Sequence, residues 1–488
     1  LDLIKEIKDK IIIESVGGSA YRTLSRVLKK LDISDKFTWF DTEEDSFFHS
    51  IGKYNHTPKG EKAFYDYSVD ATVVAKKPNG EKFFPVIETM HYDERLTNLP
   101  VGTAVLITDP DHDRLTVTQT ESANKIPELE KAGIDYVKLN NDLILTVFTA
   151  NQAFLMLMDF WSKQLKSQNL WNNHPRFMIK TTASAISWDE WAKKQGVKVV
   201  NVPVGFKEIA NIMKKVELKL KNNPEKEVII DDVLGNSINL GVNPRLVFAG
   251  EESGGMIMGT EELIKSQNGR FAIAMREKSA TEAIIVASAL IAKLQKEQTT
   301  LSQYLVQIFE ENNIVGRFDT RVDIAYYNES EPDINKLKEE KVLGEAKRTK
   351  NDLFYLSMAM GVKKGIMTLE DVKEILNDSF KSLIFDNLIS IKFVGDGTYL
   401  EFTDKYIEIR PSGTDAKTKA YGGGSDKAVL ETYANIMGNY SGDRTELHKK
   451  FIDDKFYNST KDEAMKYYLE FVDKDANNEP FEIPEYKF

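Results

Sequence analysis

The sequence predicts an α/β protein with two consecutive α/β/α domains of mixed or parallel sheets, followed by a C-terminal α+β domain with an antiparallel sheet. In the first two thirds of the chain, short apolar runs alternate with segments of helical periodicity, which is typical of parallel α/β domains. From about residue 313, short strands of alternating polarity near glycine turns indicate an antiparallel sheet with flanking helices. We expect domains at residues 1–122, 123–312 and 313–488.

The first segment begins with an apolar, β-branched run, KIIIES, at residues 10–15. Two glycines break the run, and a segment with helical spacing of its apolar residues follows at 21–31. This order predicts a strand, a turn and a helix. The run AVLIT at 104–108 predicts a buried strand that leads directly into an acidic loop.

The later segments repeat this alternation and then change character. Helices are predicted at 150–165, 187–196 and 280–294, with strands at 177–182, 197–202 and 245–249. Shorter strands of the antiparallel type are predicted at 388–393, 398–403 and 406–410. The charged and aromatic tail from about residue 439 receives no predicted role.

The composition limits the classes of function. The chain has 488 residues, a net charge of −11 and no cysteine, which excludes disulfides, thiolate metal sites and cysteine nucleophiles. The negative charge argues against a nucleic acid or an anionic membrane as a partner. The most apolar stretch, 143–160, is interrupted by Asn151 and Gln152 and falls short of a membrane span. We expect a cytoplasmic protein, monomeric or dimeric, that acts on a small molecule.

The acidic loop TDPDHDRL places Asp109, Asp111 and Asp113 at every second position. Their oxygens can converge on one point, and oxygen-only ligands select Mg²⁺ or Ca²⁺ over softer metals. An EF-hand is excluded because Arg114 stands where its glycine is required and Thr120 where its glutamate is required. The alternative is a solvated acidic turn.

Two further loops carry groups suited to a sugar. In AGEESGG, residues 249–255, Glu251 and Ser253 alternate between glycines, and a carboxylate beside a hydroxyl suits sugar hydroxyls. In VPVGFKEI, Lys207 follows Gly205 by two residues and could meet a phosphate or a sugar oxygen. The alternatives are a plain turn with exposed acids and a surface lysine.

The segment RPSGTDAKTK, residues 410–419, has the parts of a phosphate cradle. It combines the guanidinium of Arg410 with hydroxyl, backbone amide and ammonium donors. The donors are contributed by Ser412, Gly413, Thr414 and Lys417. The alternative is an ordinary hairpin turn.

Together, in this order, the four segments resemble the α-D-phosphohexomutase family of phosphoglucomutases and phosphomannomutases. The family's metal loop D-x-D-x-D-R resembles residues 109–114, and its sugar loop G-E-x-S-G resembles 250–254. Its phosphate loop R-P-S-G-T-E-P-K resembles 410–417, and its third-domain loop resembles the segment with Gly205 and Lys207. The chain departs from the family at Asp415-Ala416, which replaces Glu-Pro, and at Gly255, where several subgroups carry histidine or an aromatic residue. The spacing of the first two loops indicates an insertion around 120–175.

The resemblance also points to a missing part. The family has four domains, and the first carries the loop T-A-S-H-N-P, whose serine is phosphorylated. That loop does not precede the metal loop here. Thr182-Ala183-Ser184 and the segment 55–58 are partial matches that we do not expect to supply the nucleophile. Because the sequence starts at Leu1, we expect that the first domain is absent and that the three predicted domains correspond to family domains 2, 3 and 4.

The resemblance implies a phosphohexomutase, which shifts phosphate reversibly between the 1- and 6-positions of a hexose phosphate through a phosphoserine. Glucose is the preferred sugar and mannose a possible one. Mg²⁺ is the implied cofactor, and a hexose 1,6-bisphosphate the intermediate and activator. Arg114 is implied beside the reacting phosphate, Glu251 and Ser253 on the sugar, and the 410–417 loop on the other phosphate. Without the phosphoserine domain, the chain by itself is expected to be inactive.

Two alternatives remain open. A non-catalytic sugar-phosphate-binding or regulatory protein would retain the same loops and naturally lack the nucleophile. A metal-dependent phosphatase could use the acidic loop. A P-loop enzyme is not supported, because the pattern G-x-x-x-x-G-K-[ST] does not occur.

Overall fold

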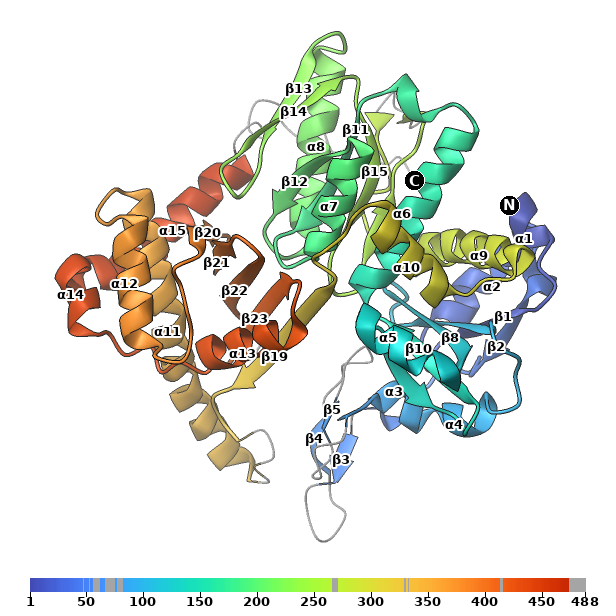
Figure 1. Ribbon diagram of the computed structural model, residues 1–488, viewed down its shortest axis with the longest axis horizontal. Helices are drawn as coiled ribbons and strands as arrows, with labels where there is room; N and C mark the ends of the chain where they lie inside the picture. The colour runs from blue at the N-terminus through green and yellow to red at the C-terminus, as the bar shows by residue number, and fades with distance from the viewer. Residues whose placement is uncertain are drawn as a thin grey trace, which may run out of the picture.

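The computed structural model describes residues 1–46, 48–51, 53–55, 62–65, 75–76, 82–265, 271–328, 331, 333–412 and 416–473. It confirms the predicted fold class. Two units with mixed sheets and covering helices are followed by a unit with an antiparallel sheet (Figure 1).

The first unit is built on a sheet of order β2-β1-β7-β8-β10-β9. β2, β1 and β7 are parallel, and β8, β10 and β9 join antiparallel. Its elements are α1 (Asp2–Lys5), β1 (Ile11–Glu14), α2 (Ala20–Lys30), β2 (Phe37–Phe40), β3 (Lys53–Asn55), β4 (Lys62–Tyr65), β5 (Ala75–Lys76), β6 (Lys82–Phe83), α3 (Pro85–Thr89), α4 (Tyr92–Arg95), β7 (Ala104–Thr108), β8 (Leu115–Ser122), α5 (Ile126–Ala132), β9 (Asp135–Lys138) and β10 (Leu143–Phe148).

This sheet does not end at the domain boundary predicted at residue 122. β10 pairs with β8 from Leu143↔Ser122 to Phe148↔Val117, so residues 123–148 complete the first sheet. The apolar strand β10 runs directly into an apolar helix, and hydropathy alone merges the two. The region predicted as an insertion, 120–175, therefore contains two strands of the first sheet.

The second unit has a sheet of order β12-β11-β15-β16, parallel except for the edge strand β16. The predicted helices and strands of this segment are present, within a few residues at their ends. Its elements are α6 (Ala150–Ser167), β11 (Arg176–Thr181), α7 (Ile186–Gln195), β12 (Lys198–Val202), α8 (Phe206–Asn222), β13 (Glu227–Asp231), β14 (Ser237–Val242), β15 (Arg245–Gly250), β16 (Met256–Met258), β17 (Ile264–Lys265), β18 (Phe271–Ala272), α9 (Ala280–Glu297) and α10 (Leu301–Glu311).

The third unit has a fully antiparallel sheet of order β19-β23-β22-β21-β20. Its elements are β19 (Phe318–Ala325), α11 (Ile334–Lys363), α12 (Leu369–Ser379), β20 (Leu388–Val394), β21 (Gly397–Phe402), β22 (Lys405–Pro411), β23 (Lys417–Gly424), α13 (Lys427–Gly438), α14 (Glu446–Phe451) and α15 (Asp454–Asp473).

The first two units share one hydrophobic core. α6 contacts β8 of the first sheet and β15 of the second, and α9 contacts β7, β8 and β16. Both helices carry broad apolar surfaces, as a helix between two sheets must. Phe154 and Ile284, from α6 and α9, belong to the resulting cluster together with Leu106 of β7. The loops that follow β7 and β15 are therefore held in a fixed relation.

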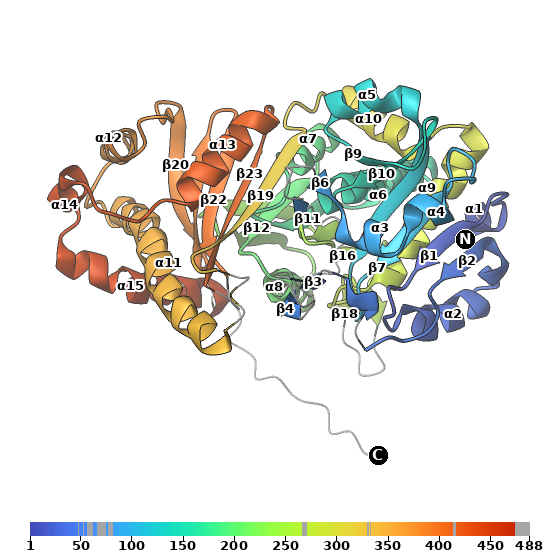
Figure 2. The same ribbon diagram turned by 90° about the horizontal axis from the view of Figure 1, so that it is seen from below.

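The last described helix, α15, connects the third unit to the second. It packs along α11 and reaches α8, as Figure 2 shows from below. At its end, the hydroxyl of Tyr468 donates to Glu208, and the ammonium of Lys215 donates to the carbonyl of Phe471 at 2.5 Å. The tail thus has a structural role that the sequence did not reveal.

Candidate active site

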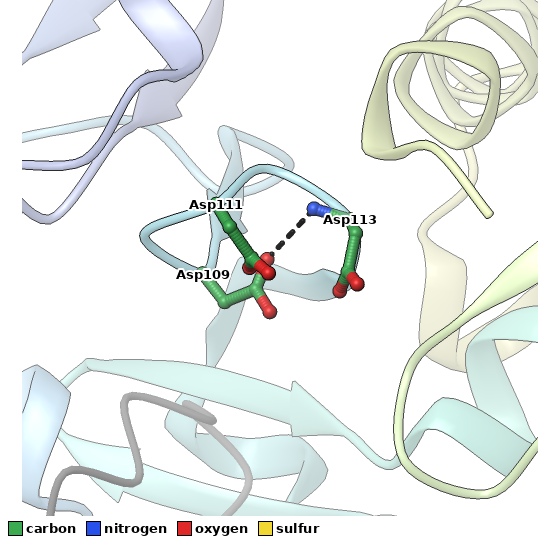
Figure 3. A group of neighbouring side chains, drawn as sticks. All are labelled: Asp109, Asp111 and Asp113. Atoms are coloured by element: carbon green, nitrogen blue, oxygen red, sulfur yellow. Dashed lines mark hydrogen bonds between the residues drawn. The ribbon is translucent and has the colours of Figure 1, made fainter. Parts of the chain in front are cut away.

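The acidic loop lies at the carboxyl end of β7, where it turns the chain into the antiparallel strand β8. Ligand oxygens of Asp109, Asp111 and Asp113 all lie within 4.8 Å of one another. The Asp109 carboxylate accepts the backbone N–H groups of Asp113 at 3.0 Å and Arg114 at 2.9 Å. These bonds fold the loop so that the three carboxylates gather in one place (Figure 3). The three oxygens therefore lie close enough to share one cation, which is the arrangement that the spacing in the sequence predicts.

The negative charges of the three clustered carboxylates favour the binding of a cation. Burial, together with the neighbouring carboxylates of Asp113 and Asp111, raises the pKa of Asp109 to about 7. The Oδ1 atom of Asp113 accepts no hydrogen bond from the described residues, and Arg114 Nε lies 3.5 Å away. Three carboxylates with an unbonded buried oxygen suit a hard divalent ion such as Mg²⁺ or Ca²⁺.

His112, which the sequence left without a role, attaches this loop to α9. Its backbone adopts φ = 63°, and its carbonyl accepts the N–H of Ala280 at 3.2 Å. Its Nε2 atom lies 2.9 Å from the hydroxyl of Thr281. Burial lowers its pKa to about 4, so the ring is neutral at neutral pH. His112 therefore positions the loop rather than adding charge to it.

The glycine-rich loop 251–255 connects β15 to β16 in a tight turn, in which the Glu251 N–H donates to the Gly255 carbonyl at 3.1 Å. Gly254, at φ = 101°, accepts the N–H of Leu115 from the metal loop's end at 3.1 Å. Glu251 is buried and Ser253 is half-buried. The two loops singled out by the sequence thus touch each other.

Lys278, which sequence reasoning missed, joins the two loops. Its ammonium lies 3.1 Å from Glu251 and 3.3 Å from Asp113. A side chain at Gly255 would be obstructed, since its Cβ would lie 2.4 Å from Lys278 Cδ. This close approach favours glycine at the position where several subgroups of the family carry histidine or an aromatic residue. No local pattern marks Lys278, because its partners are more than twenty residues away.

The segment Thr182-Ala183-Ser184 connects the second unit to the third. The Ser184 hydroxyl is fully buried and lies 2.8 Å from the hydroxyl of Thr181. The Ala183 carbonyl accepts the hydroxyl of Tyr406 from the third unit at 2.7 Å. The Ser184 hydroxyl is thus enclosed and bonded in this structure. Most of the other partial match, at 55–58, lies outside the described residues.

Gly205 and Lys207 lie at the start of α8. Gly205 precedes the helix with φ = 129°. The side chain of Lys207 is 77% exposed, 3.7 Å from Glu208 and 6.0 Å from the ring centre of Tyr468. Among the described residues, no ion pair or ring contact joins Lys207 to the metal or sugar loop. Its neighbour Phe206 lies closer, with its ring 5.8 Å from the Lys278 ammonium.

The phosphate segment begins at the end of β22. Arg410 donates to both carboxylate oxygens of Asp396, at 3.1 and 2.8 Å. The Ser412 N–H donates to the Lys417 carbonyl at 2.8 Å, which closes the loop, and Arg348 donates to the Ser412 carbonyl at 2.7 Å. Gly413 and Thr414 lie outside the described residues.

A known family model matches part of the chain. Residues 151–311 match the family model described as phosphoglucomutase/phosphomannomutase, alpha/beta/alpha domain III. This start at residue 151 agrees with the end of the first sheet at Phe148. The match covers about a third of the chain, and the second unit is therefore similar to domain III of that family. No curated protein sequence matches the chain.

Three solved structures illustrate the likeness. A putative phosphomannomutase from Thermus thermophilus has 12% identity and a TM-score of 0.45, and the match covers 90% of this chain and 61% of that one. Parafusin, a phosphoglucomutase from Paramecium, has 13% identity and a TM-score of 0.45, with coverage of 98% and 61%. An Aspergillus fumigatus N-acetylphosphoglucosamine mutase in complex with GlcNAc-6P and magnesium has 10% identity, a TM-score of 0.45, and coverage of 90% and 63%. This chain spans about three fifths of the length of these structures.

In the part of the chain that the structure describes, no helix combines the length and apolar character needed to cross a bilayer.

Proposed function

We propose that this protein is a phosphohexomutase that moves phosphate reversibly between the 1- and 6-positions of a hexose phosphate. The observation that carries the proposal is the bridge made by Lys278 between Asp113 of the metal loop and Glu251 of the sugar loop. A cation-binding cluster, a sugar-type carboxylate and a lysine converge at one point. That combination suits phosphoryl transfer, which depends mainly on positioning and electrostatics.

Each loop has a distinct task under this proposal. Asp109, Asp111 and Asp113 would hold Mg²⁺, which supplies positive charge against the oxygens of the transferring phosphate. Arg114, whose side chain is 41% exposed and lies 3.5 Å from Asp109, would contact the same phosphate. Glu251 and Ser253 orient the sugar through its hydroxyl groups.

The remaining motif residues bind the phosphate that does not react. Arg410, Ser412, Gly413, Thr414 and Lys417 clamp it, so that either end of the sugar can be presented to the metal loop. Gly205 and Lys207 make an additional substrate contact. Because Lys207 is exposed and lies beside Tyr468, this contact requires its side chain to turn from the position seen.

The phosphoryl donor is proposed to be a serine outside these 488 residues. Ser184 is unsuitable because it is buried and bonded to Thr181. The chain by itself should therefore bind the substrate and the hexose 1,6-bisphosphate but not interconvert hexose phosphates. We propose glucose as the preferred sugar, on the basis of the two adjacent glutamates of the sugar loop, with mannose as a poorer one.

Calorimetric titration with glucose 6-phosphate and glucose 1,6-bisphosphate, with and without Mg²⁺, tests this proposal on the chain alone. Mannose 6-phosphate should bind more weakly, and glucose should not bind measurably. Absence of sugar-phosphate binding would overturn the proposal. The polypeptide isolated from its own source should also convert glucose 1-phosphate to glucose 6-phosphate. Binding without turnover in that material would instead establish a non-catalytic sugar-phosphate-binding protein.

A further inference from the structure

One face of the third unit's sheet is turned toward the second unit. Tyr406 of β22 marks this face, because its hydroxyl donates to the Ala183 carbonyl at 2.7 Å. Side chains alternate between the two faces of a strand, so Glu408 and Arg410 lie on the same face as Tyr406. The arginine of the phosphate motif is therefore directed to the side where the second unit lies.

Cross-strand pairing extends this face to the edge strand β19. Arg410 pairs with Lys419 of β23, and Lys419 pairs with Asp323 of β19. In the adjacent row, Tyr421 of β23 pairs with Arg321 of β19. Directly paired residues share a face. Arg321 thus stands on the same face as Arg410, one strand beyond Lys419.

The two arginines are held in the same way. Arg410 Nε and Nη2 donate to Asp396 at 3.1 and 2.8 Å. Arg321 Nε and Nη2 donate to Asp323 at 2.9 and 2.8 Å. A guanidinium has five N–H groups, so each fork leaves three for another acceptor. Among the described residues, none accepts a hydrogen bond from Nη1 of either arginine. Each aspartate therefore orients the guanidinium group of its arginine and leaves some of its N–H groups available for another acceptor.

Arg321 also acts on a carboxyl group of the sugar loop through its charge, and it remains accessible. Its charge lowers the pKa of Glu252, although burial and Glu251 raise the pKa of that carboxyl overall. Burial lowers the pKa of Lys419, and Arg321 and Arg410 lower it further, so three cations stand close together. The Arg321 side chain is 36% exposed. The Arg410 side chain is only 12% exposed, so Arg321 is the more accessible of the two arginines, and this group of three cations suits a multivalent anion.

We propose that Arg321 is a further phosphate-binding residue of this site, which grips the same phosphate of the sugar phosphate as Arg410 from the other side of Lys419. Asp323 is its positioning residue, as Asp396 is for Arg410. The inference rests on the proposed function, since it names one more contact to that ligand. It also explains why β19, which carries no family motif, has an Arg–Asp fork on this face.

Titration of the chain with glucose 6-phosphate and with inorganic phosphate tests this assignment. Arg321→Gln should raise the Kd for glucose 6-phosphate at least about tenfold, the usual effect of losing a charge-assisted hydrogen bond. Arg321→Lys should give a smaller loss, because it keeps the charge but not the fork. Arg317→Gln is the matched control, since Arg317 lies just before β19 and donates to the Ile314 carbonyl. It also removes one positive charge, and its Kd for glucose 6-phosphate should stay within about twofold of the wild-type value.

A double-mutant cycle separates a shared phosphate from two independent sites. If both arginines hold one phosphate, the losses from Arg321→Gln and Arg410→Gln should couple rather than add. The inference on Arg321 is overturned if both Arg321 variants bind as tightly as the control Arg317→Gln. In that case, binding by the wild type and weaker binding by Arg410→Gln would leave the proposed function standing. If the folded wild type binds neither ligand, both are overturned. A thermal midpoint of Arg321→Lys equal to that of the wild type would show that this variant is folded.

Discussion

The ammonium group of Lys278 lies 3.1 Å from a carboxylate oxygen of Glu251, and both side chains are nearly buried, at 11% and 6% exposed. The same ammonium lies 3.3 Å from Asp113. One cation therefore neutralises part of the charge in the sugar loop and part of the charge in the metal loop. Because these loops follow strands of different sheets, Lys278 links the first two units at the place where their proposed functions meet.

Lys278→Met should lower the free energy of unfolding, and the size of this decrease should depend on Mg²⁺. Removing the ammonium leaves Glu251 buried without its ion-pair partner, which costs about 1–3 kcal/mol. It also removes a positive charge that competes with a metal ion for Asp113, so Mg²⁺ should bind more tightly. Chemical unfolding with and without Mg²⁺ should show a lower free energy of unfolding that Mg²⁺ partly restores.

The matched control is Lys296→Met, which removes a lysine whose ion pair with Glu6 is exposed on both sides. Exposed pairs contribute little, so its effect should stay within about 0.5 kcal/mol with or without Mg²⁺. Equal losses in the two variants would mean that the Lys278 bridge does not stabilise the site.

Asp111→Asn should weaken Mg²⁺ binding without loss of fold. Asp111 is the exposed member of the carboxylate cluster, so its substitution leaves no buried group unpaired. The thermal midpoint of the wild type should rise with Mg²⁺ concentration, because a ligand that binds the folded state stabilises it. The variant should show little of this rise. Asp142→Asn, an exposed substitution on the turn between β9 and β10, should respond like the wild type. A full Mg²⁺ response in Asp111→Asn would exclude the loop as the cation site.

Most of the fold was predictable, because its strands and helices follow simple periodicities. The strand predicted at 104–108 is β7, and the helix predicted from Ala280 is α9. The prediction missed strand β10, which adjoins the correctly predicted helix α6, and it therefore placed the first domain boundary too early, at residue 122. Thr149 and Gln152 form a capping box at this junction. The pattern T-x-x-Q in the sequence could have separated the strand from the helix.

The site was predictable only where its residues are neighbours in sequence. Asp109, Asp111 and Asp113 converge because a short loop brings them together. Lys278 and Arg321 reach their places through helix packing and strand pairing, which no local pattern encodes. Their tertiary neighbours, rather than their sequence neighbours, indicate a role in the site.

Glu408 should make stability depend on pH. It is fully buried, its two carboxylate oxygens accept no hydrogen bond from the described residues, and burial raises its pKa to about 8 from 4.5. Between pH 4.5 and 8 the folded protein keeps this proton and the unfolded chain loses it. The contribution of Glu408 to stability therefore falls as pH rises through that window, by at most about 1.4 kcal/mol per pH unit.

Glu408→Gln should remove this slope, so that the variant gains stability relative to the wild type as pH rises from 5 to 8. Urea unfolding at several pH values measures the difference. Glu401→Gln, on the neighbouring strand β21, is the matched control and should run parallel to the wild type. A constant difference between Glu408→Gln and the wild type over the whole range would contradict the buried proton.

Tyr468→Phe should loosen the attachment of α15 to α8. The Tyr468 hydroxyl donates to Glu208, whose side chain is only 4% exposed, and its loss leaves that carboxylate with the exposed Lys207 at 3.7 Å. An underbonded buried carboxylate should lower the free energy of unfolding by about 1–3 kcal/mol. Limited proteolysis should cleave α15 sooner. Tyr467→Phe changes the adjacent residue, whose hydroxyl makes no hydrogen bond with the described residues, and it should leave both measurements unchanged. If the two variants behaved alike, α15 would be held by packing along α11 rather than by its bond to the second unit.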